Sequence, residues 1–300
     1  MILIISQNNE ITTTEVIKQL IAMDKKFIRV HEDEVFEIKT LNKRIVLESG
    51  RNRFFLDEIK SVWYRRGGLV FKRLKYANRS IHLNMNETQH WLEDYVRKTL
   101  ESKKHINRES NSDVNKLIVL DKAKEIGLDV PEYYLAENTR DTKIGNTIIK
   151  TITGNAMLDE IRKNSGGFMY TSVVEEHEDG DFFITFFQEK IEKDFEIRTF
   201  YLNGKCWSMA IFSQNDEQTK VDFRKYNAVK PNRNIPYNLP TPVEEKVHQL
   251  MKSLDLNSGS IDFIKKGDQH YFLEINPIGQ FTGMSNTCNY SLEQKIADYL

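Results

Sequence analysis

The sequence predicts a mixed α/β protein with more than one domain. A βαβ pattern opens the chain, with an apolar strand at Ile2–Ser6, a helix of three- and four-residue apolar spacing, and a strand at Phe27–His31. A second indication is a β-hairpin of β-branched and aromatic residues within 261–281. The length of 300 residues suits roughly two domains. We therefore expect layered α/β units.

The composition excludes several classes of partner. The 43 Lys and Arg residues almost balance the 44 Asp and Glu residues, so no global charge attracts nucleic acid or an anionic membrane. No apolar run is long enough to cross a membrane, and the first residues lack the basic region of a signal peptide. Cys206 and Cys288 have no CxxC partner. We predict a cytoplasmic protein with no nucleic-acid or membrane partner.

The sequence also predicts the remaining elements of the N-terminal region. Thr12 or Thr13 is expected to cap the first helix. Residues 35–66 are strand-rich and end in the segment VWYRR. Its two arginines, Arg65 and Arg66, either bind an anion or are solvated at a strand end.

A long helix and a boundary follow. Residues 84–104 repeat apolar side chains at helical spacing, which places Trp91 and Tyr95 in the core or in an interface. Residues 106–112 are polar and predict a domain boundary. Asp113 is expected to cap the next helix.

The central region contains an unusual lysine and two glycine-containing loops. Thr147–Thr151 reads as a strand that carries Lys150, whose side chain either reaches solvent or contacts a phosphate. Gly154–Asn155 and Lys163–Gly167 are candidate phosphate-covering loops. Neither matches a Walker P-loop, and a plain turn is the alternative.

A second hairpin follows from a strong turn signal. The pair 203–204 is Asn-Gly, which predicts a type I′ turn between strands at Phe195–Leu202 and Lys205–Ser213. Glu196 and Arg198 alternate with apolar residues and therefore share one face. They form either a salt bridge or contacts to a ligand.

The segment 214–242 is polar, carries four prolines and is too long for a simple connection, which is often a sign of function. It contains Asp222 and Arg224 at a spacing that places both on one side of an extended chain. A local salt bridge between them is the alternative interpretation. A helix is expected at Pro242–Leu256.

Three polar side chains interrupt the apolar hairpin near the end of the chain. They are Asp262 and Glu274, within strands expected at 261–264 and 271–275, and Asn276, directly after the second strand. An odd loop length would place Asp262 opposite Glu274, and Asn276 shares a face with Glu274. Carboxylate and amide oxygens are ligands that Mg²⁺ prefers. The alternative is a solvated hairpin face.

The order of these features resembles an ATP-grasp ligase. Within that superfamily the chain is similar to the graspetide (microviridin-like) synthetases, which cross-link ribosomally made peptides, and especially to the grasp-with-spasm type. The resemblance covers essentially the whole chain. The segments that carry it are MILIIS at 1–6, VWYRRGG at 62–68, QEKIEKDFEIRTF at 188–200, DFR at 222–224, LEINPIGQF at 273–281 and CNY at 288–290.

The resemblance implies an ATP-grasp fold of the α/β (α+β) class with three parts. These are an N-terminal pre-ATP-grasp domain at 1–108, a central subdomain at 109–190, and a C-terminal subdomain at 191–300 that carries the metal hairpin.

The resemblance also implies the cofactors ATP and Mg²⁺ and a role for each residue. The Mg²⁺ ligands are Asp262, Glu274 and Asn276. The ATP phosphates contact Lys116 and Lys150. The adenine lies against the backbone of a hinge, which is Gln188, Glu189, Lys190 and Ile191. The ribose is bound by Glu196 in preference to Glu192. The catalytic residues are Arg198, which faces the phosphates and the reacting carboxylate, and Asp222 and Arg224, which contact the core peptide.

The implied function is an ATP-dependent macrocyclase. It would activate Asp or Glu side chains of a precursor peptide, with its leader and core, as acyl phosphates and form ester or amide cross-links. The resemblance is compatible with a homodimer and with a radical-SAM partner protein that has a SPASM domain. The alternatives are a ligase that adds a free amino acid to a protein or small-molecule carboxylate, and an inactive scaffold that only binds a peptide.

Overall fold

The computed structural model describes residues 1–150, 157–162, 165–168, 171–174, 180–216, 218–222, 224–225 and 227–300. The chain forms two compact units, and each is discontinuous in sequence. Unit 1 comprises Met1–Ser112, Gln280–Ser285 and Ser291–Leu300, and unit 2 comprises Asp113–Gly279 and Asn286–Tyr290. The mixture of helices and sheets confirms the predicted α/β class. The three-part division at 108 and 190 stays a prediction.

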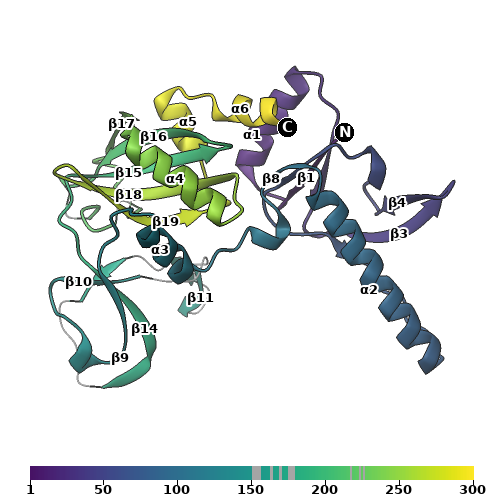
Figure 1. Ribbon diagram of the computed structural model, residues 1–300, viewed down its shortest axis with the longest axis horizontal. Coiled ribbons are helices and arrows are strands. Elements are labelled where there is room, and N and C mark those ends of the chain that lie inside the picture. Colours follow the sequence, from purple (N-terminus) through teal and green to yellow (C-terminus); the bar gives the residue numbers. More distant parts are fainter. Residues whose placement is uncertain are drawn as a thin grey trace. The chain divides into compact units, whose positions relative to one another are not determined.

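Unit 1 is built on a parallel sheet with the strand order β2-β1-β6-β8. These strands are β1 (Ile2–Ser6), β2 (Phe27–His31), β6 (Ser61–Tyr64) and β8 (Lys104–Ile106). The β1 strand is central in this sheet and buried along its whole length, and burial of both of its faces explains its unbroken apolar sequence. The helices of unit 1 are α1 (Ile11–Ala22), α2 (Arg79–Glu101) and α6 (Leu292–Tyr299), and Figure 1 shows α6 beside α1.

A smaller sheet with the order β5-β4-β3-β7 completes unit 1. Its strands are β3 (Val35–Leu41), β4 (Arg44–Glu48), β5 (Arg53–Phe55) and β7 (Val70–Phe71).

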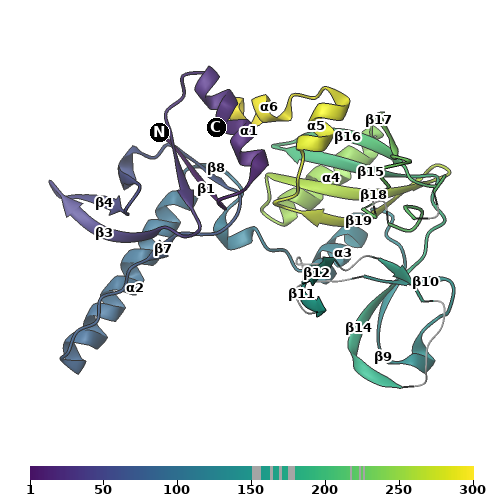
Figure 2. The ribbon, with the colours of Figure 1, turned by 180° about the vertical axis from the view of Figure 1, so that it is seen from behind.

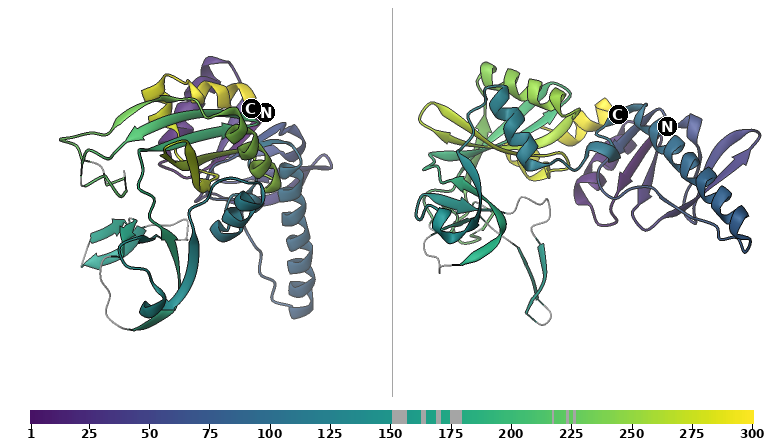
Figure 3. Two further views of the ribbon diagram at one scale, coloured as in Figure 1. Left: turned by 60° about the vertical axis from the view of Figure 1, so that its left-hand side comes forward. Right: turned by 60° about the horizontal axis from the view of Figure 1, so that its bottom comes forward.

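The α2 helix differs from its prediction. It begins at Arg79, where Asn78 caps it, five residues before the expected start at Asn84. Trp91 is 67% exposed and Tyr95 is 55% exposed, so the described part of the chain does not place them in the core of unit 1. The left view of Figure 3 shows the first turns of α2 projecting from the rest of unit 1.

The first helix is capped by Glu10, so the expectation of Thr12 or Thr13 is wrong. The Glu10 carboxylate accepts hydrogen bonds from the Thr13 N–H at 2.5 Å and from the Thr13 hydroxyl at 2.6 Å. Gln280 donates to the same carboxylate at 3.0 Å. A carboxylate suits a helix N-terminus because it accepts from the free N–H groups there.

Arg65 explains why Glu10 occupies this place. Its side chain is 4% exposed, donates to Glu10 at 3.3 Å, and lies with its guanidinium carbon 5.8 Å from the centre of the Phe281 ring. Arg65 is therefore neither solvated nor directed at an external anion. The buried ion pair with Glu10, which also accepts from Gln280, and the contact with Phe281 join the WYRR segment to the IGQF segment.

Unit 2 contains a five-stranded antiparallel sheet with the order β17-β16-β15-β18-β19. Its strands are β15 (Phe195–Leu202), β16 (Lys205–Phe212), β17 (Arg233–Tyr237), β18 (Ser258–Lys266) and β19 (Gln269–Asn276). Asn203 and Gly204 both have positive φ, as the predicted type I′ turn requires. Figure 2 shows these strands side by side.

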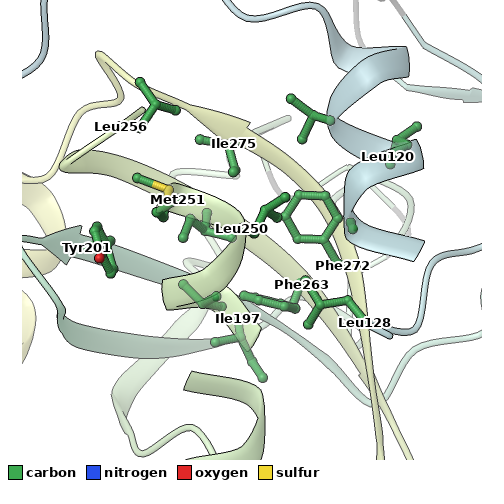
Figure 4. Packing of buried hydrophobic residues seen from close by; sticks show 14 of the residues in the cluster. Leu120, Leu128, Ile197, Tyr201, Leu250, Met251, Leu256, Phe263, Phe272 and Ile275 are labelled. Carbon is green, nitrogen blue, oxygen red and sulfur yellow. The ribbon is translucent and has the colours of Figure 1, made fainter. Parts of the chain in front are cut away.

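The core of unit 2 lies between this sheet and two helices, α3 (Lys116–Glu125) and α4 (Thr241–Ser253). Asn115, not Asp113, caps α3. Figure 4 shows Leu120 of α3 and Leu250 of α4 packed near Phe272 of β19. This apolar layer occupies one face of the sheet and leaves the other face for polar side chains.

A second antiparallel sheet of unit 2 has the order β13-β10-β14-β9. Its strands are β9 (Tyr133–Asn138), β10 (Thr147–Ile149), β13 (Ser172–Val173) and β14 (Asp181–Glu189). The strands β11 (Met157–Arg162) and β12 (Ser165–Phe168) form a separate hairpin, and α5 (Thr282–Cys288) follows β19. Gly154, Asn155, Lys163 and Asn164 of the predicted phosphate-covering loops lie outside the described residues.

Within the described ranges, none of the helices combines the length and the hydrophobicity needed to cross a membrane.

The Glu10 cap predicts a specific loss of stability in acid. Burial would raise the pKa of Glu10, but Arg65, Thr13 and Gln280 outweigh it and lower the pKa from 4.5 to about 2. The unfolded chain takes up this proton near pH 4.5, and the folded chain only near pH 2. The carboxylate therefore stabilises unit 1 above pH 4.5 by on the order of 3 kcal/mol, and this contribution is lost as the pH falls from 4.5 to 2.

We expect Glu10→Gln to remove this contribution. The difference in unfolding free energy between wild type and variant, measured by guanidinium denaturation, should be large at pH 6 and small near pH 2. Glu15→Gln, on the same helix, is the control. A difference for Glu10→Gln that does not change with pH would contradict the ion-pair account.

Candidate functional site

A row of charged side chains crosses the polar face of the five-stranded sheet in unit 2. Arg198 of β15 lies opposite Asp262 of β18, and Asp262 lies opposite Glu274 of β19. Ile197 and Phe263, the next residues along their strands, point into the core on the other face. The structure thus brings Asp262 and Glu274 together as the sequence predicted.

The reason for this pairing differs from the prediction. The strands run closer to the turn than expected, and only Gly267 and Asp268 separate Lys266 from its partner Gln269. A β-bulge restores the pairing, because Phe263 pairs with Phe272 whereas Asp262 pairs with Glu274, which leaves Leu273 as the extra residue. The bulge therefore places Asp262 opposite Glu274, which the sequence analysis had attributed to an odd loop length.

The row consists of two ion pairs. The Nε of Arg198 donates to Oδ1 of Asp262 at 2.9 Å, and its Nη2 donates to Oδ2 at 3.0 Å. The Nζ of Lys116, at the start of α3, donates to Oε2 of Glu274 at 3.0 Å. Arg198 therefore forms the salt bridge that the sequence left open, but with Asp262. Its fork geometry is the form that also binds phosphate.

Lys150 adds a third positive charge to the row. It directly follows β10, and its Nζ lies 5.9 Å from the centre of the Phe186 ring. Burial lowers the pKa of Lys150, and the nearby Glu274 opposes this effect. Burial likewise acts to raise the pKa of Glu274, but Lys150 and Lys116 outweigh it and hold that pKa below its ordinary value. Glu274 therefore remains a carboxylate between two lysines.

These side chains line a single pocket of unit 2, together with most of the other predicted site residues. The predicted residues that line it are Lys116, Lys150, Gln188, Glu189, Lys190, Ile191, Glu196, Arg198, Asp222, Arg224, Asp262 and Glu274. The pocket gathers residues from the five-stranded and four-stranded sheets of the unit, from α3 and from the 214–242 segment.

Asn276 is the predicted site residue that does not line the pocket. It lies opposite Ser260, on the same face as Glu274, and its Oδ1 accepts a hydrogen bond from the Ile278 N–H at 3.2 Å. The chain then turns closely over β18, because a Cβ on Gly279 would come within 2.5 Å of the Ser260 side chain. Only glycine fits this turn without movement of Ser260.

Two backbone N–H groups of the predicted hinge already donate hydrogen bonds within the protein. The Glu189 N–H donates to the Glu132 carbonyl at 2.7 Å, and the Lys190 N–H donates to the Asn146 carbonyl at 2.9 Å. These two backbone donors are therefore engaged in holding the end of β14. Glu192 pairs with Lys190 at 2.9 Å, and its side chain is 68% exposed.

Glu196, by contrast, is buried in the pocket. Burial raises its pKa to about 7, although the adjacent Lys193 acts in the opposite direction, and Asp222 and Asp262 raise it further. One Glu196 oxygen pairs with Lys193, a buried lysine that the sequence analysis did not select. Lys193 also donates to the Val221 carbonyl at 3.2 Å. The sequence signal for this ion pair was that Lys193 lies three residues before Glu196.

Asp222 and Arg224 form the local salt bridge that the sequence analysis had set as the alternative. The Nη2 of Arg224 donates to Oδ2 of Asp222 at 2.6 Å. Asp222 is buried and also accepts from the Thr171 N–H at 3.0 Å, a contact that the sequence did not predict. The Arg224 side chain remains 46% exposed within the pocket. Phe223, between the two, lies outside the described residues.

No group of three or more His, Cys, Asp or Glu side chains could hold a metal ion in the part of the chain that the structure describes. The predicted ligand set is not of that kind, because its third member is the amide of Asn276. Asp262 and Glu274 are two directly facing carboxylates that a hard cation could use on this face.

The comparisons with known proteins identify the fold. A search of protein families finds none that matches the chain, and no curated protein matches it. Several solved structures are similar over nearly the whole length. The macrocyclase MdnC bound with its precursor peptide MdnA, from Microcystis aeruginosa MRC, has 24% identity and a TM-score of 0.75 over 100% of this chain and 99% of that one.

Two further structures agree. A Chryseobacterium gregarium RiPP-associated ATP-grasp ligase, in complex with ADP and a leader and core peptide, has 22% identity and a TM-score of 0.76 over 99% of this chain and 94% of that one. The ATP-grasp ligase PsnB with a minimal precursor, Mg and ADP has 14% identity and a TM-score of 0.64 over 99% and 96% of the two chains. The chain therefore has the ATP-grasp fold, as predicted.

The unusual environment of Glu196 is directly measurable. We expect its carboxyl carbon to titrate near pH 7 in ¹³C NMR of the ligand-free protein, because burial disfavours the charged form. Glu196→Gln, which removes the signal, provides the assignment. A midpoint near the ordinary value of 4.5 would show that Lys193 compensates the burial fully.

Proposed function

We propose that the protein is an ATP-dependent ligase that cross-links side chains of a ribosomally made precursor peptide. The observation that carries this proposal is the row Arg198–Asp262–Glu274–Lys116, with Lys150 beside it, in one pocket. The fold supports it, since similar structures are described as macrocyclases or ligases in complex with precursor peptides. Asp or Glu side chains of the core peptide are the groups to be activated.

The residues of the row, together with Asn276 on the same face outside the pocket lining, fit both Mg²⁺ and ATP. Asp262, Glu274 and Asn276 would hold Mg²⁺, which when bound neutralises charge on phosphate oxygens. Lys116, Lys150 and Arg198 supply the positive charge that a triphosphate needs. Two of these cations are now paired with the metal-binding carboxylates. Phosphate oxygens are acceptors of the same kind and can replace those carboxylates as their partners.

The reaction follows from the chemistry of carboxylates. An oxygen of the peptide carboxylate attacks the γ-phosphorus of ATP, the bond from that phosphorus to the ADP oxygen breaks, and an acyl phosphate forms. A peptide hydroxyl or amine then attacks the acyl carbon, phosphate leaves, and the nucleophile loses its proton. The product is an ester or an amide, and the peptide has lost one water for each ring.

Arg224 and Asp222 act on the peptide in this proposal. The half-exposed Arg224 guanidinium can hold an acidic side chain before it is phosphorylated. Asp222 already accepts from Thr171 and Arg224, and its pKa lies below the ordinary value because Arg224 and Thr171 outweigh the effect of burial. A carboxyl group with a lowered pKa is a weak base. We therefore assign Asp222 to orientation of Arg224 and not to deprotonation of the nucleophile.

The nucleotide roles of the remaining residues are part of the same proposal. Glu196 binds the ribose in preference to Glu192, because it is buried in the pocket whereas Glu192 is exposed and paired with Lys190. A cytoplasmic location stays a prediction from the sequence composition, and a homodimer and a radical-SAM partner with a SPASM domain stay predictions from the resemblance.

Mass spectrometry of a co-expressed precursor peptide tests the function. A short peptide encoded beside the enzyme should lose one water for each ring, and with purified enzyme and peptide this loss should require ATP and Mg²⁺. A mass gain equal to an amino acid residue would favour the alternative ligase. Binding of the peptide with ATP hydrolysis but without a change in peptide mass would favour the inactive scaffold.

Arg224→Ala should separate peptide recognition from nucleotide binding. Loss of a charge-assisted contact costs on the order of 1.5–3 kcal/mol, or roughly tenfold to a hundredfold. We expect cross-linking to fall by that factor while ATP affinity, measured by calorimetry, stays close to wild type. Arg224→Lys should rescue poorly because lysine lacks the planar fork.

Arg233→Ala, at an exposed position at the start of β17, is the matched control and should keep both properties. A parallel loss of ATP affinity and cross-linking in Arg224→Ala would place this residue in the nucleotide site and refute its assignment to the peptide.

Glu274→Ala should abolish ring closure while the protein stays folded. The change removes one of the two facing carboxylates and with it the proposed metal site. Electron paramagnetic resonance of Mn²⁺ in the presence of ADP should show weaker binding, and circular dichroism should show an unchanged fold. Glu245→Ala, on the exposed side of α4, is the control. Ring closure at nearly the wild-type rate in Glu274→Ala would rule out this metal site.

A further inference from the structure

Lys193 is a buried lysine that holds two parts of the pocket at once. Its side chain is 5% exposed. The ammonium group donates to Oε1 of Glu196 and, at 3.2 Å, to the carbonyl oxygen of Val221. Glu196 lies on β15, whereas Val221 lies in the 214–242 segment directly before Asp222. One side chain therefore bridges a strand of the sheet and the segment beside it.

The two carboxylate oxygens of Glu196 have different surroundings. Oε1 pairs with Lys193, whereas Oε2 is buried and, among the described residues, has no hydrogen-bond partner. A buried acceptor without a partner is unfavourable, so Oε2 is suited to a donor from a ligand. Burial raises the pKa of Glu196 to about 7, and Lys193 opposes this effect. Lys193 therefore favours the ionised form, whose oxygens are both acceptors.

The second acceptor of Lys193 begins a short series of contacts that ends at Arg224. The peptide bond is planar, so a fixed Val221 carbonyl also fixes the N–H group of Asp222. The Asp222 carboxylate accepts from the Arg224 N–H at 3.0 Å and from the Arg224 Nε at 2.9 Å. The Asp222 carbonyl accepts from the Lys225 N–H at 3.1 Å. The direction of the Arg224 guanidinium thus depends on where the backbone at Val221 is held.

A purely structural ion pair is the alternative for Lys193. A buried pair is by itself weak evidence of stabilisation, because loss of hydration offsets the attraction between the charges. Lys193 differs from such a pair in two respects. It has a second acceptor at Val221, and Oε2 of its partner Glu196 is unpaired within the described residues. Both features are expected of a residue that serves bound ligands.

We propose that Lys193 is a positioning residue through which a nucleotide bound at Glu196 orders Asp222 and Arg224. This inference rests on the proposed function, in which Glu196 binds the ribose and Arg224 holds an acidic side chain of the peptide. Ribose hydroxyls that donate to Oε2 fix the Glu196 carboxylate, and the carboxylate fixes the Lys193 ammonium. The ammonium then holds the Val221 carbonyl, so that the peptide-binding residues are ordered before the peptide arrives.

Such a link makes the binding of nucleotide and peptide cooperative. The second ligand does not have to order contacts that the first has already ordered. Linkage also requires that each ligand strengthens the binding of the other by the same factor, which is typically on the order of tenfold. The acidic side chain of the peptide is therefore bound most firmly when the nucleotide that activates it is present.

Amide hydrogen exchange tests the link with ADP and Mg²⁺ alone. In wild type, these ligands should slow exchange of the Arg224 and Lys225 N–H groups, which both donate to Asp222, by roughly tenfold. Lys193→Met keeps the apolar stem but lacks the ammonium, so saturating ADP should no longer slow exchange at these positions.

Lys18→Met is the matched control. Lys18 pairs with Glu15 at the same three-residue spacing, but on the surface of α1, with side chains 62% and 35% exposed. This variant should show the same slowing of exchange by ADP and Mg²⁺ as wild type.

Calorimetry of peptide binding gives a second measurement. The precursor peptide encoded beside the enzyme should bind wild type roughly tenfold more tightly with ADP and Mg²⁺ than without them. In Lys193→Met this ratio should approach one. Lys193→Arg, which keeps a charged donor, should restore part of the ratio. Thermal unfolding of each variant reports whether the fold is kept.

The outcomes separate this inference from the proposed function. Wild type that binds no ADP would overturn both. Wild type that binds ADP without slower exchange at Arg224 and Lys225 would overturn the role of Lys193 alone, and this measurement does not depend on the folding of any variant. Slowing by ADP that persists in Lys193→Met would overturn it as well. A variant that unfolds at a lower temperature but keeps the tenfold ratio would show that Lys193 is only structural.

Discussion

The register between β18 and β19 is the constraint on which the site depends. Side chains alternate between the two faces of a strand, so a slip of one residue would exchange the faces of β19. Glu274 would then lie beside Ile261 on the core side. The bulge at Leu273 prevents this and allows Phe272 and Ile275, three residues apart, both to enter the core (Figure 4). One extra residue thus serves the packing and the pocket together.

The charges of the pocket are arranged so that none of the central groups is isolated. Asp262 forms an ion pair with Arg198, and Glu274 forms one with Lys116. The positive charge of Lys150 also helps to hold the pKa of Glu274 below its ordinary value. Buried charges require such partners, because removal from water is unfavourable for an unpaired ion. The binding of a metal ion and a triphosphate would exchange these internal partners for external ones of the same charge. The pocket can therefore accept highly charged ligands without leaving a bare ion in either state.

Much of the architecture was predictable because it is encoded locally. The strands at Ile2–Ser6 and Phe27–His31 follow from runs of apolar residues, and the β15–β16 hairpin follows from the Asn203–Gly204 pair. The facing of Asp262 and Glu274 was also predictable, although the bulge that produces it was not. Bulges have weak sequence signals because one extra residue resembles any other.

The remaining features depend on residues that are distant in sequence. Threonines have the local preference for a helix cap, yet Glu10 takes this position because Arg65 and Gln280 reach it from far along the chain. The apolar pattern around Trp91 is equally compatible with core and surface, since periodicity does not reveal what covers a helix. The partner of Lys193 and the bonding of the hinge N–H groups likewise became visible only from the packed strands.

The discontinuity of unit 1 has a consequence for the order of folding. Its sheet forms from the first 112 residues, but Ser61 donates to the Leu300 carbonyl at 2.8 Å and Lys25 donates to the Ala297 carbonyl at 2.6 Å. On the ribosome, the strands of unit 1 emerge long before residues 291–300 are made. Unit 2 is synthesised in between and can complete its core first. The unit translated first is therefore the last to close, and the nascent chain must keep its early apolar strands from aggregating throughout that interval.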